Sequence, residues 1–596
     1  MCGIFAYLGN HISMENIQQE FEKTRMRGPD HSHIQWIREG WLFGFHRLKI
    51  VDTSDTANQP MLREGCYSIC NGEIYNHQQI RHRLLEKICG SDRSLEDESS
   101  VFSSHCDCEV VPVGISAWGV EKLVEDIDGV FSFVCYREDT DEVCIARDRF
   151  GVRPLFWGWN SHGELLVSSE AKSIMTLVDT VTPFPPGCYW KGSMKFRENG
   201  GVGTLVGTIT EYYTPLYPVV VAKTNTSLKA DEINLARVKA GIRDRFTLAV
   251  RKRLMSDRPV GCLLSGGLDS SLVSALVARE FKENGKGDLL TFSIGLPGSP
   301  DLDYADRVSK WIGSKHHRVE LDRSVWLEAI PEVIYAIESY DVTTVRASVG
   351  NYLISKYISE NTDVVVVYNG DGSDEQSGYL YLGNAPDVDS FQEELCRLLK
   401  EIHRYDVLRS DRSVSSHWGL EARTPFLDRD FVDYYMGVVP TAWKTYGRLS
   451  KKNGIFLPGE SSSSESSDGR LNGGMIEKNL LRCSFNDMDL LPQEVLWRRK
   501  EAFSDGCSSV TESWHDIIKS HVKEIITPED FKESASRYSP RPLSLEALYY
   551  RRIYESHFGN NPLVDHYWMP RWSEGVRDPS ARELADYGEK KNVEVD

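Results

Sequence analysis

The chain has no long apolar run: among its 596 residues, no stretch approaches the roughly 18 apolar side chains that a membrane span needs. Its start carries no apolar segment of the kind found in secretory signals. Basic residues are in deficit, since 69 Lys and Arg stand against 88 Asp and Glu, a net charge of −19. We therefore expect no membrane association, no nucleic-acid partner and a cytoplasmic location.

Two chemical signatures are also missing. Cys66 and Cys70 form one close pair and Cys106 and Cys108 another, but the pairs lack zinc-finger spacing. The odd count of 13 scattered cysteines predicts mostly reduced thiols rather than a disulfide framework. The glycine-rich loop described below lacks the Gly-Lys-Ser/Thr ending of a Walker A site, so transfer of a γ-phosphate is not indicated.

The first third of the chain has the pattern of a strand-rich α+β domain. Short apolar or alternating segments at 41–45, 129–136, 142–146 and 165–168 are separated by turn signals. We therefore expect a first domain over residues 1–210.

From about residue 236 the pattern changes to strands that alternate with amphipathic helices. Apolar runs at 259–264, 289–294 and 363–368 have the length of buried strands, with a helix expected over 271–281. This alternation predicts a doubly wound parallel sheet with a helical C-terminal part, in a second domain over 236–596. Residues 211–235 would be a connector, and the Ser-rich stretch 456–474 is expected to be disordered.

Cys2 is the first candidate for a catalytic residue. Removal of Met1 would leave Cys2 with both a thiol and a free α-amine, whose ordinary pKa is about 7.7–8.0. Such an amine can act as the base for its own side chain, the arrangement of an N-terminal nucleophile. Taken alone, a second-position cysteine is more often an accident of the start, so the rest of the chain has to decide.

A stronger signal is the loop SGGLDSS at 265–271, which follows the expected strand at 259–264 and opens a helix. Two adjacent glycines let the backbone approach an anion, and hydroxyls and helix N-terminal amides can bind it. Asp269 would repel a phosphate unless it held Mg²⁺.

A second acidic turn, NGDGSDE at 369–375, follows the expected strand at 363–368. Because parallel strands end at one edge of a sheet, both loops can face one ligand, and Asp269 and Asp374 can share a metal. The alternative for this turn alone is a solvated acidic loop.

Motifs along nearly the whole chain resemble those of known families. The segments 1–4 (MCGI), 27–30 (RGPD), 71–76 (NGEIYN) and 147–148 (RD) look like those of class II glutamine amidotransferases. The loop at 265–271 is similar to the pyrophosphate loop of ATP-pyrophosphatases. Together with 295–301, 341–348, 419–428, 502–506 and 567–570, the chain resembles the glutamine-hydrolysing asparagine synthetases. The resemblance implies an N-terminal-nucleophile glutaminase domain before an ATP-pyrophosphatase domain, and a homodimer.

The resemblance implies a first site in which Cys2 attacks the side-chain amide of glutamine and ammonia is released. The Asn71 side chain and the Gly72 amide would form the oxyanion hole, where donors favour the developing charge. The implied glutamine-binding residues are Arg47 for the α-carboxylate, Glu73 and Asp107 for the α-amine, and Ile50, Val51 and Asn71.

The resemblance implies a second site in which the β-carboxylate of aspartate attacks the α-phosphorus of ATP. The product β-aspartyl-AMP would then react with ammonia delivered through an internal passage. Lys478 and Asp371 would be catalytic there, and Asp269 and Asp374 would hold Mg²⁺. The implied ATP-binding residues are Leu264, Ser265, Gly266, Gly267, Asp269, Ser270, Ile294, Asn369 and Gly370, and the implied aspartate-binding residues are Thr343, Thr344, Arg346 and Ser348.

Three features depart from the family pattern. Asp371 stands where the family usually has Glu, and Cys106 replaces a Ser often found before the glutamine-binding Asp. The Ser-rich stretch 456–474 lies just before Lys478. Two other functions stay open at this point: a related amidotransferase that activates another carboxylate, such as a β-lactam synthetase-like enzyme, and a non-catalytic relative.

Overall fold

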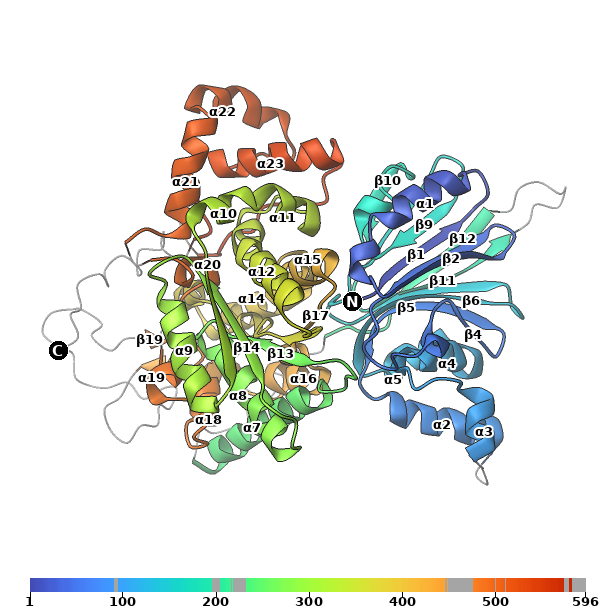
Figure 1. Ribbon diagram of the computed structural model, residues 1–596, viewed down its shortest axis with the longest axis horizontal. Helices are drawn as coiled ribbons and strands as arrows, with labels where there is room; N and C mark the ends of the chain where they lie inside the picture. The colour runs from blue at the N-terminus through green and yellow to red at the C-terminus, as the bar shows by residue number, and fades with distance from the viewer. Residues whose placement is uncertain are drawn as a thin grey trace, which may run out of the picture.

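The protein consists of two lobes that lie side by side, with the N-terminus at their junction (Figure 1). The computed structural model describes residues 1–90, 95–195, 204–215, 217, 232–444, 447–448, 475–498, 500–509, 511–572 and 578–580. The Ser-rich stretch 456–474 and most of the connector 211–235 lie outside these residues, so the expected disorder and the boundary between the domains stay predictions.

The first lobe is built on two antiparallel sheets, each of six strands within the described residues. The first has the order β10-β8-β9-β1-β3-β2 and the second the order β12-β11-β7-β6-β5-β4. Their strands are β1 (Gly3–Leu8), β2 (His31–Arg38), β3 (Trp41–Arg47), β8 (Phe156–Trp159), β9 (Leu165–Ser168), β10 (Thr180–Pro183), β4 (Met61–Arg63), β5 (Cys66–Ile74), β6 (Gly129–Arg137), β7 (Glu142–Arg147), β11 (Cys188–Lys195) and β12 (Thr204–Glu211). The strands expected at 41–45, 129–136, 142–146 and 165–168 are confirmed.

Helices cover the outer faces of this lobe, while alternate side chains of both sheets fill the layer between them. Phe43, Ile69 and Val134 belong to that inner cluster. Phe21 of α1 stacks on His46 of the first sheet with ring centroids 3.7 Å apart. The helical elements are α1 (Met14–Glu22), η1 (Arg25–Arg27), η2 (Asp55–Ala57), α2 (His77–Cys89), α3 (Leu95–Val101), η3 (Asp107–Glu109), α4 (Val110–Trp118), α5 (Val120–Asp126) and η4 (Ala171–Ser173). The resulting helix–sheet–sheet–helix layering is that of the expected glutaminase fold.

The second lobe contains a parallel sheet with the order β15-β14-β13-β16-β17. Its strands are β13 (Val260–Leu263), β14 (Leu290–Gly295), β15 (Lys315–Glu320), β16 (Val366–Tyr368) and β17 (Glu421–Arg423). β16 is shorter than the expected 363–368, because pairing with β13 begins only where Val260 meets Val366. The strand order reverses between β13 and β16, the place where open α/β sheets bind ligands.

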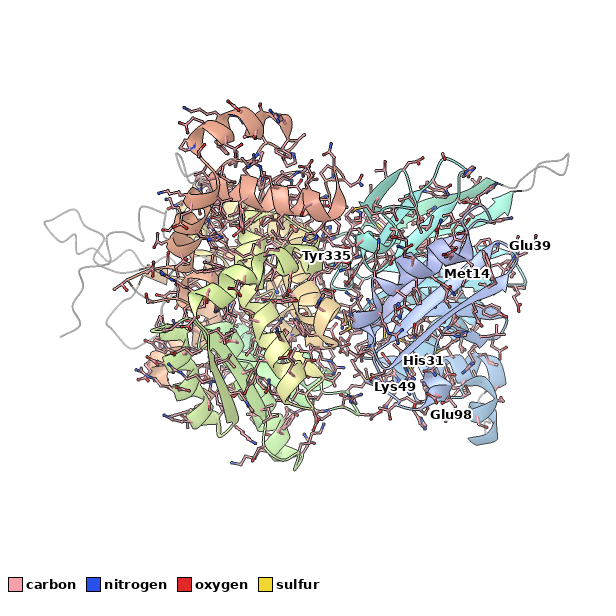
Figure 2. All side chains as sticks on the ribbon, turned by 45° about the horizontal axis from the view of Figure 1, so that its top comes forward. Met14, His31, Glu39, Lys49, Glu98 and Tyr335 are labelled. Atoms are coloured by element: carbon pink, nitrogen blue, oxygen red, sulfur yellow. The ribbon has the colours of Figure 1, made fainter. Side chains whose placement is uncertain are left out.

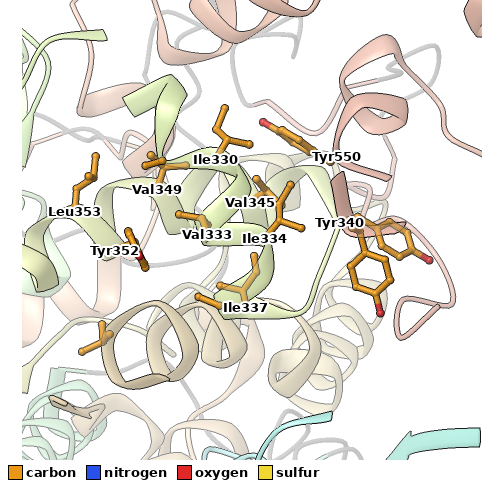
Figure 3. Packing of buried hydrophobic residues seen from close by; sticks show 14 of the residues in the cluster. Ile330, Val333, Ile334, Ile337, Tyr340, Val345, Val349, Tyr352, Leu353 and Tyr550 are labelled. Atoms are coloured by element: carbon orange, nitrogen blue, oxygen red, sulfur yellow. The ribbon is translucent and has the colours of Figure 1, made fainter. Parts of the chain in front are cut away.

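Helices pack on both faces of this sheet, as a doubly wound fold requires. Val366 and Tyr368 join the cluster under α7, α8 and α9, whereas Val367 joins the cluster under α11 and α12. Figure 3 shows the cluster under α11 and α12 from close by, with Ile334 and Val345 among its members. These helices are α7 (Glu232–Lys252), α8 (Leu268–Glu283), α9 (Pro300–Ile312), α10 (Arg323–Glu328), α11 (Ile330–Ile337) and α12 (Val342–Asn361).

The remainder of the chain is mainly helical, as expected, and α21–α23 form a layer next to α10 and α11 (Figure 1). Its elements are α13 (Asp374–Ser377), η5 (Leu380–Asn384), α14 (Val388–Glu401), η6 (Ile402–Arg404), α15 (Asp406–Trp418), η7 (Pro425–Leu427), α16 (Arg429–Gly437), α17 (Thr441–Lys444), β18 (Gly447–Arg448), β19 (Met475–Ile476), α18 (Asn479–Phe485), α19 (Gln493–Leu496), α20 (Phe503–Gly506), α21 (Trp514–Ile525), α22 (Pro528–Ser534), η8 (Ala535–Arg537) and α23 (Leu545–Phe558). Within the described residues, none of the helices combines the length and the apolar character needed to span a membrane.

Buried ion pairs join the two lobes. Arg27 of the first lobe lies 3.1 Å from Asp411 on α15, and Arg423 of β17 lies 3.3 Å from Glu73 on β5. All four side chains are almost fully buried. Removing one partner of such a pair leaves a buried charge unpaired and destabilises the fold by about 3–5 kcal/mol. These contacts therefore fix how the lobes sit together.

A second set of contacts lies near Tyr335, which Figure 2 shows at the boundary between the lobes. The ammonium group of Lys172 lies 4.7 Å from the centre of the Tyr335 ring. The backbone amides of Ala171 and Lys172 donate to the Glu338 carboxylate at 3.1 and 2.7 Å. The first lobe thus presents the amides at the start of η4 to a carboxylate that ends α11.

Candidate active sites

Cys2 lies at the junction of the lobes, just before β1. Its thiol is 3.8 Å from the Leu48 carbonyl, and its own carbonyl accepts a 3.0 Å hydrogen bond from Arg27. Burial raises the pKa of the thiol, while the nearby amino group lowers it. In the chain as it stands that amine belongs to Met1, which is buried and donates to the Leu420 carbonyl at 3.3 Å. Burial lowers the pKa of this amine to about 6.

Asn71 and Gly72 occupy β5, opposite Ser132 and Phe131 of β6. The Asn71 side chain is fully buried, and neither its oxygen nor its nitrogen has a hydrogen-bond partner within the described residues. An unpaired buried amide costs about 1–3 kcal/mol, which marks it as a group that awaits a ligand. At Gly72 any side chain is excluded, since a Cβ would lie 2.2 Å from the Val130 carbonyl oxygen.

Two buried carboxylates lie beside these residues. Asp107 accepts a 2.6 Å hydrogen bond from the Ile74 amide, and burial raises its pKa to about 6. Burial also raises the pKa of Glu73 well above its ordinary value, and the charges of Glu421 and Asp107 add to this. Two carboxylates held this way can stabilise an ammonium group that enters between them.

The Arg47 guanidinium is engaged with the turn that follows β3. It donates to the Ser54 carbonyl at 2.6 Å, to the Asn58 side chain at 2.8 Å and to the Asp52 carbonyl. The same turn carries the predicted Ile50, which is buried, and Val51, which is partly exposed. A direct contact between Arg47 and a glutamine carboxylate therefore stays a prediction.

The loop at 265–271 connects β13 to α8 at the point where the strand order reverses. The Ser265 and Ser270 hydroxyls lie 2.9 Å apart and so brace the turn. Gly266 has a φ of +72°, and a Cβ there would lie 2.5 Å from the Cβ of Tyr304. Glycine is required on both counts. All predicted ATP-binding residues except Gly266 line one pocket, namely Leu264, Ser265, Gly267, Asp269, Ser270, Ile294, Asn369 and Gly370.

Four charged side chains converge in this pocket. The Lys478 ammonium group lies 2.6 Å from Asp269 and 2.7 Å from Asp374, and Lys500 lies 2.7 Å from Asp374 and 3.5 Å from Asp269. Ser373 donates to Asp269 at 2.7 Å. Burial raises the pKa of Asp269, but the two lysines outweigh it and hold this pKa well below its ordinary value. The Asp269 carboxylate is therefore charged in this pocket.

Lys478 is held in a strained backbone conformation. It has a φ of +58°, the left-handed region, at the residue that precedes α18. A non-glycine residue in this region costs about 1–3 kcal/mol and is found mainly at functional sites. Its side chain is fully buried.

Asp371 lines the same pocket and is bound from two sides. It accepts a 2.5 Å hydrogen bond from Arg409 and a 2.8 Å bond from the Asn369 side chain. Burial raises the pKa of Asp371, and Arg409 opposes this. Nearby Glu375 accepts from the Tyr379 hydroxyl at 2.7 Å, and burial raises its pKa well above the ordinary value.

Of the four predicted aspartate-binding residues, Thr343 is the one that lines the pocket. Its hydroxyl is buried and has no hydrogen-bond partner within the described part of the chain. The Thr344 hydroxyl donates to Asp341 at 3.0 Å, and the Ser348 hydroxyl donates to the Thr344 carbonyl at 2.6 Å. Arg346 binds Glu546 and Asp578 through four hydrogen bonds of 2.6–2.7 Å. A role for the last three in binding aspartate stays a prediction.

Comparison with known proteins agrees with this two-site arrangement. Residues 1–184 match the glutamine amidotransferase domain family, and residues 241–388 and 376–574 match the asparagine synthase family. The glutamine-hydrolysing asparagine synthetases of Cricetulus griseus and Gallus gallus are 39% identical to this chain, and that of Homo sapiens is 38% identical. Each comparison covers 98% of this chain and 99% of the relative.

The chain belongs to the glutamine-hydrolysing asparagine synthetase family. This membership confirms the resemblance and the two-domain fold class. It also favours asparagine synthesis over the two alternatives left open by the sequence, since the relatives that match nearly the whole chain are asparagine synthetases.

Two basic side chains of this asparagine synthetase family member, Lys500 and Arg409, were missed by reasoning from sequence. Lys500 lies in a run of charged residues at 498–501, and Arg409 lies on α15, where nothing distinguishes it from a surface arginine. Only the fold places them against Asp374 and Asp371. No local signal marks either residue, since several other charged residues lie between Lys478 and Lys500.

Proposed function

We propose that this protein catalyses the ATP-dependent synthesis of asparagine from aspartate with glutamine as the nitrogen donor, releasing AMP, pyrophosphate and glutamate. The observation that carries the proposal is the cluster of Lys478, Lys500, Asp269 and Asp374 at the reversal point of the parallel sheet. Two lysines and two carboxylates are what a polyphosphate with its metal ion needs. The membership of the chain in the family supports the identity of the acceptor and the nitrogen donor.

In the first site, Cys2 would act after removal of Met1. Its sulfur would attack the glutamine side-chain carbonyl, and its own α-amine would take the thiol proton and pass it to the departing ammonia. The tetrahedral oxyanion would be bound by the Asn71 side chain and the Gly72 amide, an interaction made only as charge develops. Water would then hydrolyse the thioester to glutamate and restore the thiol.

In the second site, an oxygen of the aspartate β-carboxylate would attack the α-phosphorus of ATP. The bond to the β-phosphate would break, giving β-aspartyl-AMP and pyrophosphate. Lys478 and Lys500 would turn from the two carboxylates to the phosphate oxygens and offset the charge there. Ammonia would attack the acyl carbon, AMP would leave, and Asp371 would accept the proton that the nitrogen loses.

Magnesium fits this site by its donor set. Asp269 and Asp374 offer carboxylate oxygens, and the Ser265 and Ser270 hydroxyls lie in the same pocket, all hard ligands of the kind Mg²⁺ prefers. We propose that Asp269 and Asp374 hold Mg²⁺ together with ATP. When bound, the ion would neutralise part of the phosphate charge.

The two sites lie on either side of β16 and β17. The Asn369 amide at the end of β16 donates to the Arg423 carbonyl of β17 at 3.1 Å, and the Arg423 side chain reaches Glu73 in the first lobe. We propose that ammonia passes between the lobes here, shielded from water. The proposed homodimer rests on the family resemblance alone, and the proposed cytoplasmic location rests on the scattered cysteines and the missing secretory segment.

The decisive assay measures asparagine and AMP formed from aspartate and ATP-Mg²⁺, with glutamine or ammonia as the nitrogen source. Equal amounts of asparagine and AMP from either source are expected. If no AMP forms with either source, the chain is not an enzyme of this kind. AMP without asparagine would show that another group accepts the activated carboxylate.

A further inference from the structure

Three thiols and one carboxylate converge behind the glutaminase pocket. The Cys106 sulfur is 3.7 Å from one oxygen of Asp107, and the Cys108 sulfur is 4.0 Å from the other. The ligand atoms of these three residues all lie within 4.8 Å of one another. The Cys108 thiol also donates to the Gly72 carbonyl at 3.5 Å, on the strand β5 that carries Cys70. The chemistry proposed above uses Asp107 but none of the three thiols.

The fold holds this cluster in place. Cys106 and Cys108 flank Asp107 at the start of η3, and Cys70 lies on β5, two residues before Gly72. Glu109 anchors the turn, since it accepts from the Ser103 and Ser104 amides at 2.9 and 3.0 Å. Each of the four candidate ligands is at most 6% exposed. Secondary hydrogen bonds of this kind orient metal ligands in known sites.

The ligand types and spacings suit a thiophilic cation. A tetrahedral zinc ion with bonds of about 2.3 Å to sulfur holds its sulfur ligands about 3.8 Å apart. The ligand atoms of Cys106, Asp107 and Cys108 lie within 4.8 Å of one another, so a small closure brings them to that spacing. Thiolates select zinc and related soft or borderline metals over Mg²⁺. Thiols bind such a cation as thiolates, so its binding releases protons to solvent.

We propose that Cys70, Cys106, Cys108 and Asp107 form a binding site for one thiophilic divalent cation such as Zn²⁺. A cation bound there takes the Asp107 carboxylate away from the glutamine α-amine. A cation in this site therefore inhibits glutamine-dependent synthesis but leaves the synthetase pocket free. The binding claim stands on the geometry alone, whereas the inhibition rests on the proposed glutaminase function.

Cadmium reports such binding directly, because a thiolate bound to Cd²⁺ gives a charge-transfer band in the ultraviolet. The full-length Cys2→Ala protein, kept reduced with a phosphine, is titrated with Cd²⁺ so that the catalytic thiol cannot contribute. One equivalent is expected to bind. Adding Cys106→Ser, a near-isosteric change, is expected to weaken cadmium binding at least tenfold. Mutation of a residue that merely supports a metal ligand already weakens metal binding by this much.

The matched control removes a thiol elsewhere: Cys89→Ser, at the end of α2 and partly exposed, leaves the cadmium titration unchanged. An unfolded Cys106→Ser protein would be recognised by its circular dichroism, and Cys108→Ser then takes its place. Zn²⁺ is also expected to raise the Tm of the Cys2→Ala protein but not of the Cys106→Ser form. Binding that disappears with Cys2 alone, or that survives both Cys106→Ser and Cys108→Ser, overturns the proposal.

Inhibition is tested on the enzyme with its native Cys2. Zn²⁺ is expected to raise the KM for glutamine at least tenfold while ammonia-dependent asparagine synthesis stays unchanged, and Cys106→Ser is expected to escape this. Equal inhibition with both nitrogen sources overturns the regulatory claim. A mass lower by two hydrogens, with no metal bound, would show a disulfide instead and also overturn it. If the metal-free enzyme forms no AMP, the proposed function fails while the cadmium result stands by itself.

Discussion

In the glutaminase pocket the central polar group is the uncharged Asn71 amide, buried and unpartnered within the described residues, whereas in the synthetase pocket charged side chains bind one another. The first pocket sits on strands of a two-sheet sandwich. The second is assembled from loops and segments that lie far apart in the chain. Lys478, for example, meets Asp269 across 209 residues.

This difference separates two ways of preparing a site. The rigid strands can hold an unsatisfied amide in position, so its cost of about 1–3 kcal/mol is met by the sheet and recovered when the oxyanion forms. In the loops, the two lysines instead form ion pairs with Asp269 and Asp374 while no ligand is bound. Binding of ATP with its metal then exchanges one set of ion pairs for another, at little net cost in charge burial. The two pockets should therefore respond differently to loss of one residue.

The sharpest separation is expected from Cys2→Ala. Glutamine-dependent synthesis should fall at least about 10⁴-fold, because no other group replaces a lost nucleophile. Ammonia-dependent synthesis should stay within about twofold of the parent, since Cys2 does not enter the synthetase pocket. Asparagine formation with each nitrogen source checks both expectations. Loss of both activities would contradict the division into two sites.

The converse separation is expected from Lys478→Met. Pyrophosphate release should fall about 10²–10³-fold with either nitrogen source, the usual loss when one charge-stabilising group is removed from an active site. Glutamine hydrolysis to glutamate should persist. Lys282→Met, which changes an exposed lysine at the end of α8, is the matched control and should behave as the parent. Normal pyrophosphate release in the Lys478 variant would remove this lysine from the mechanism.

These predictions also show which parts could be derived from sequence. The two strand-loop motifs at 265–271 and 369–375 carry their own chemistry, so the meeting of Asp269 and Asp374 followed from the rule on parallel strands. Cys2 was singled out by its position after Met1, whereas Asn71 and the acidic pair came from a resemblance to whole motifs. Four strands of the first lobe and three of the parallel sheet were predictable because apolar spacing reports burial.

The remainder depended on contacts between distant segments. Arg346 was expected in the aspartate pocket, yet it binds Glu546, 200 residues away, and no local pattern records that pairing. Lys500 and Arg409 have the opposite history, since each looked like a surface cation and each reaches a carboxylate in the pocket. Long charged side chains are therefore the least predictable part of the site, because their partners are chosen by the fold.

A moderate effect is expected from acidifying the glutaminase pocket. Burial raises the pKa of Asp107 from 3.8 to about 6, so its carboxylate is charged above pH 6 and neutral below it. The KM for glutamine should thus rise about tenfold for each pH unit below 6, and more steeply where Glu73, whose pKa is also raised, is protonated too. An Asp107→Asn variant should have a high KM that changes little over this range. A KM for the parent that stays flat down to pH 5 would contradict the assignment.

The smallest effect is expected for Asp371→Glu, at the position where this chain departs from the family. Asp371→Glu should keep ammonia-dependent synthesis within about tenfold, because the carboxylate lines an open pocket and can still reach Arg409. Asp371→Asn keeps the size but loses the base, so asparagine formation should fall about 10²-fold, in the range for general base catalysis. In a single turnover, pyrophosphate release should fall less, since adenylation precedes the step that needs this base. Measuring both products in each variant decides the point: an equal fall in pyrophosphate and asparagine would place Asp371 in the adenylation step.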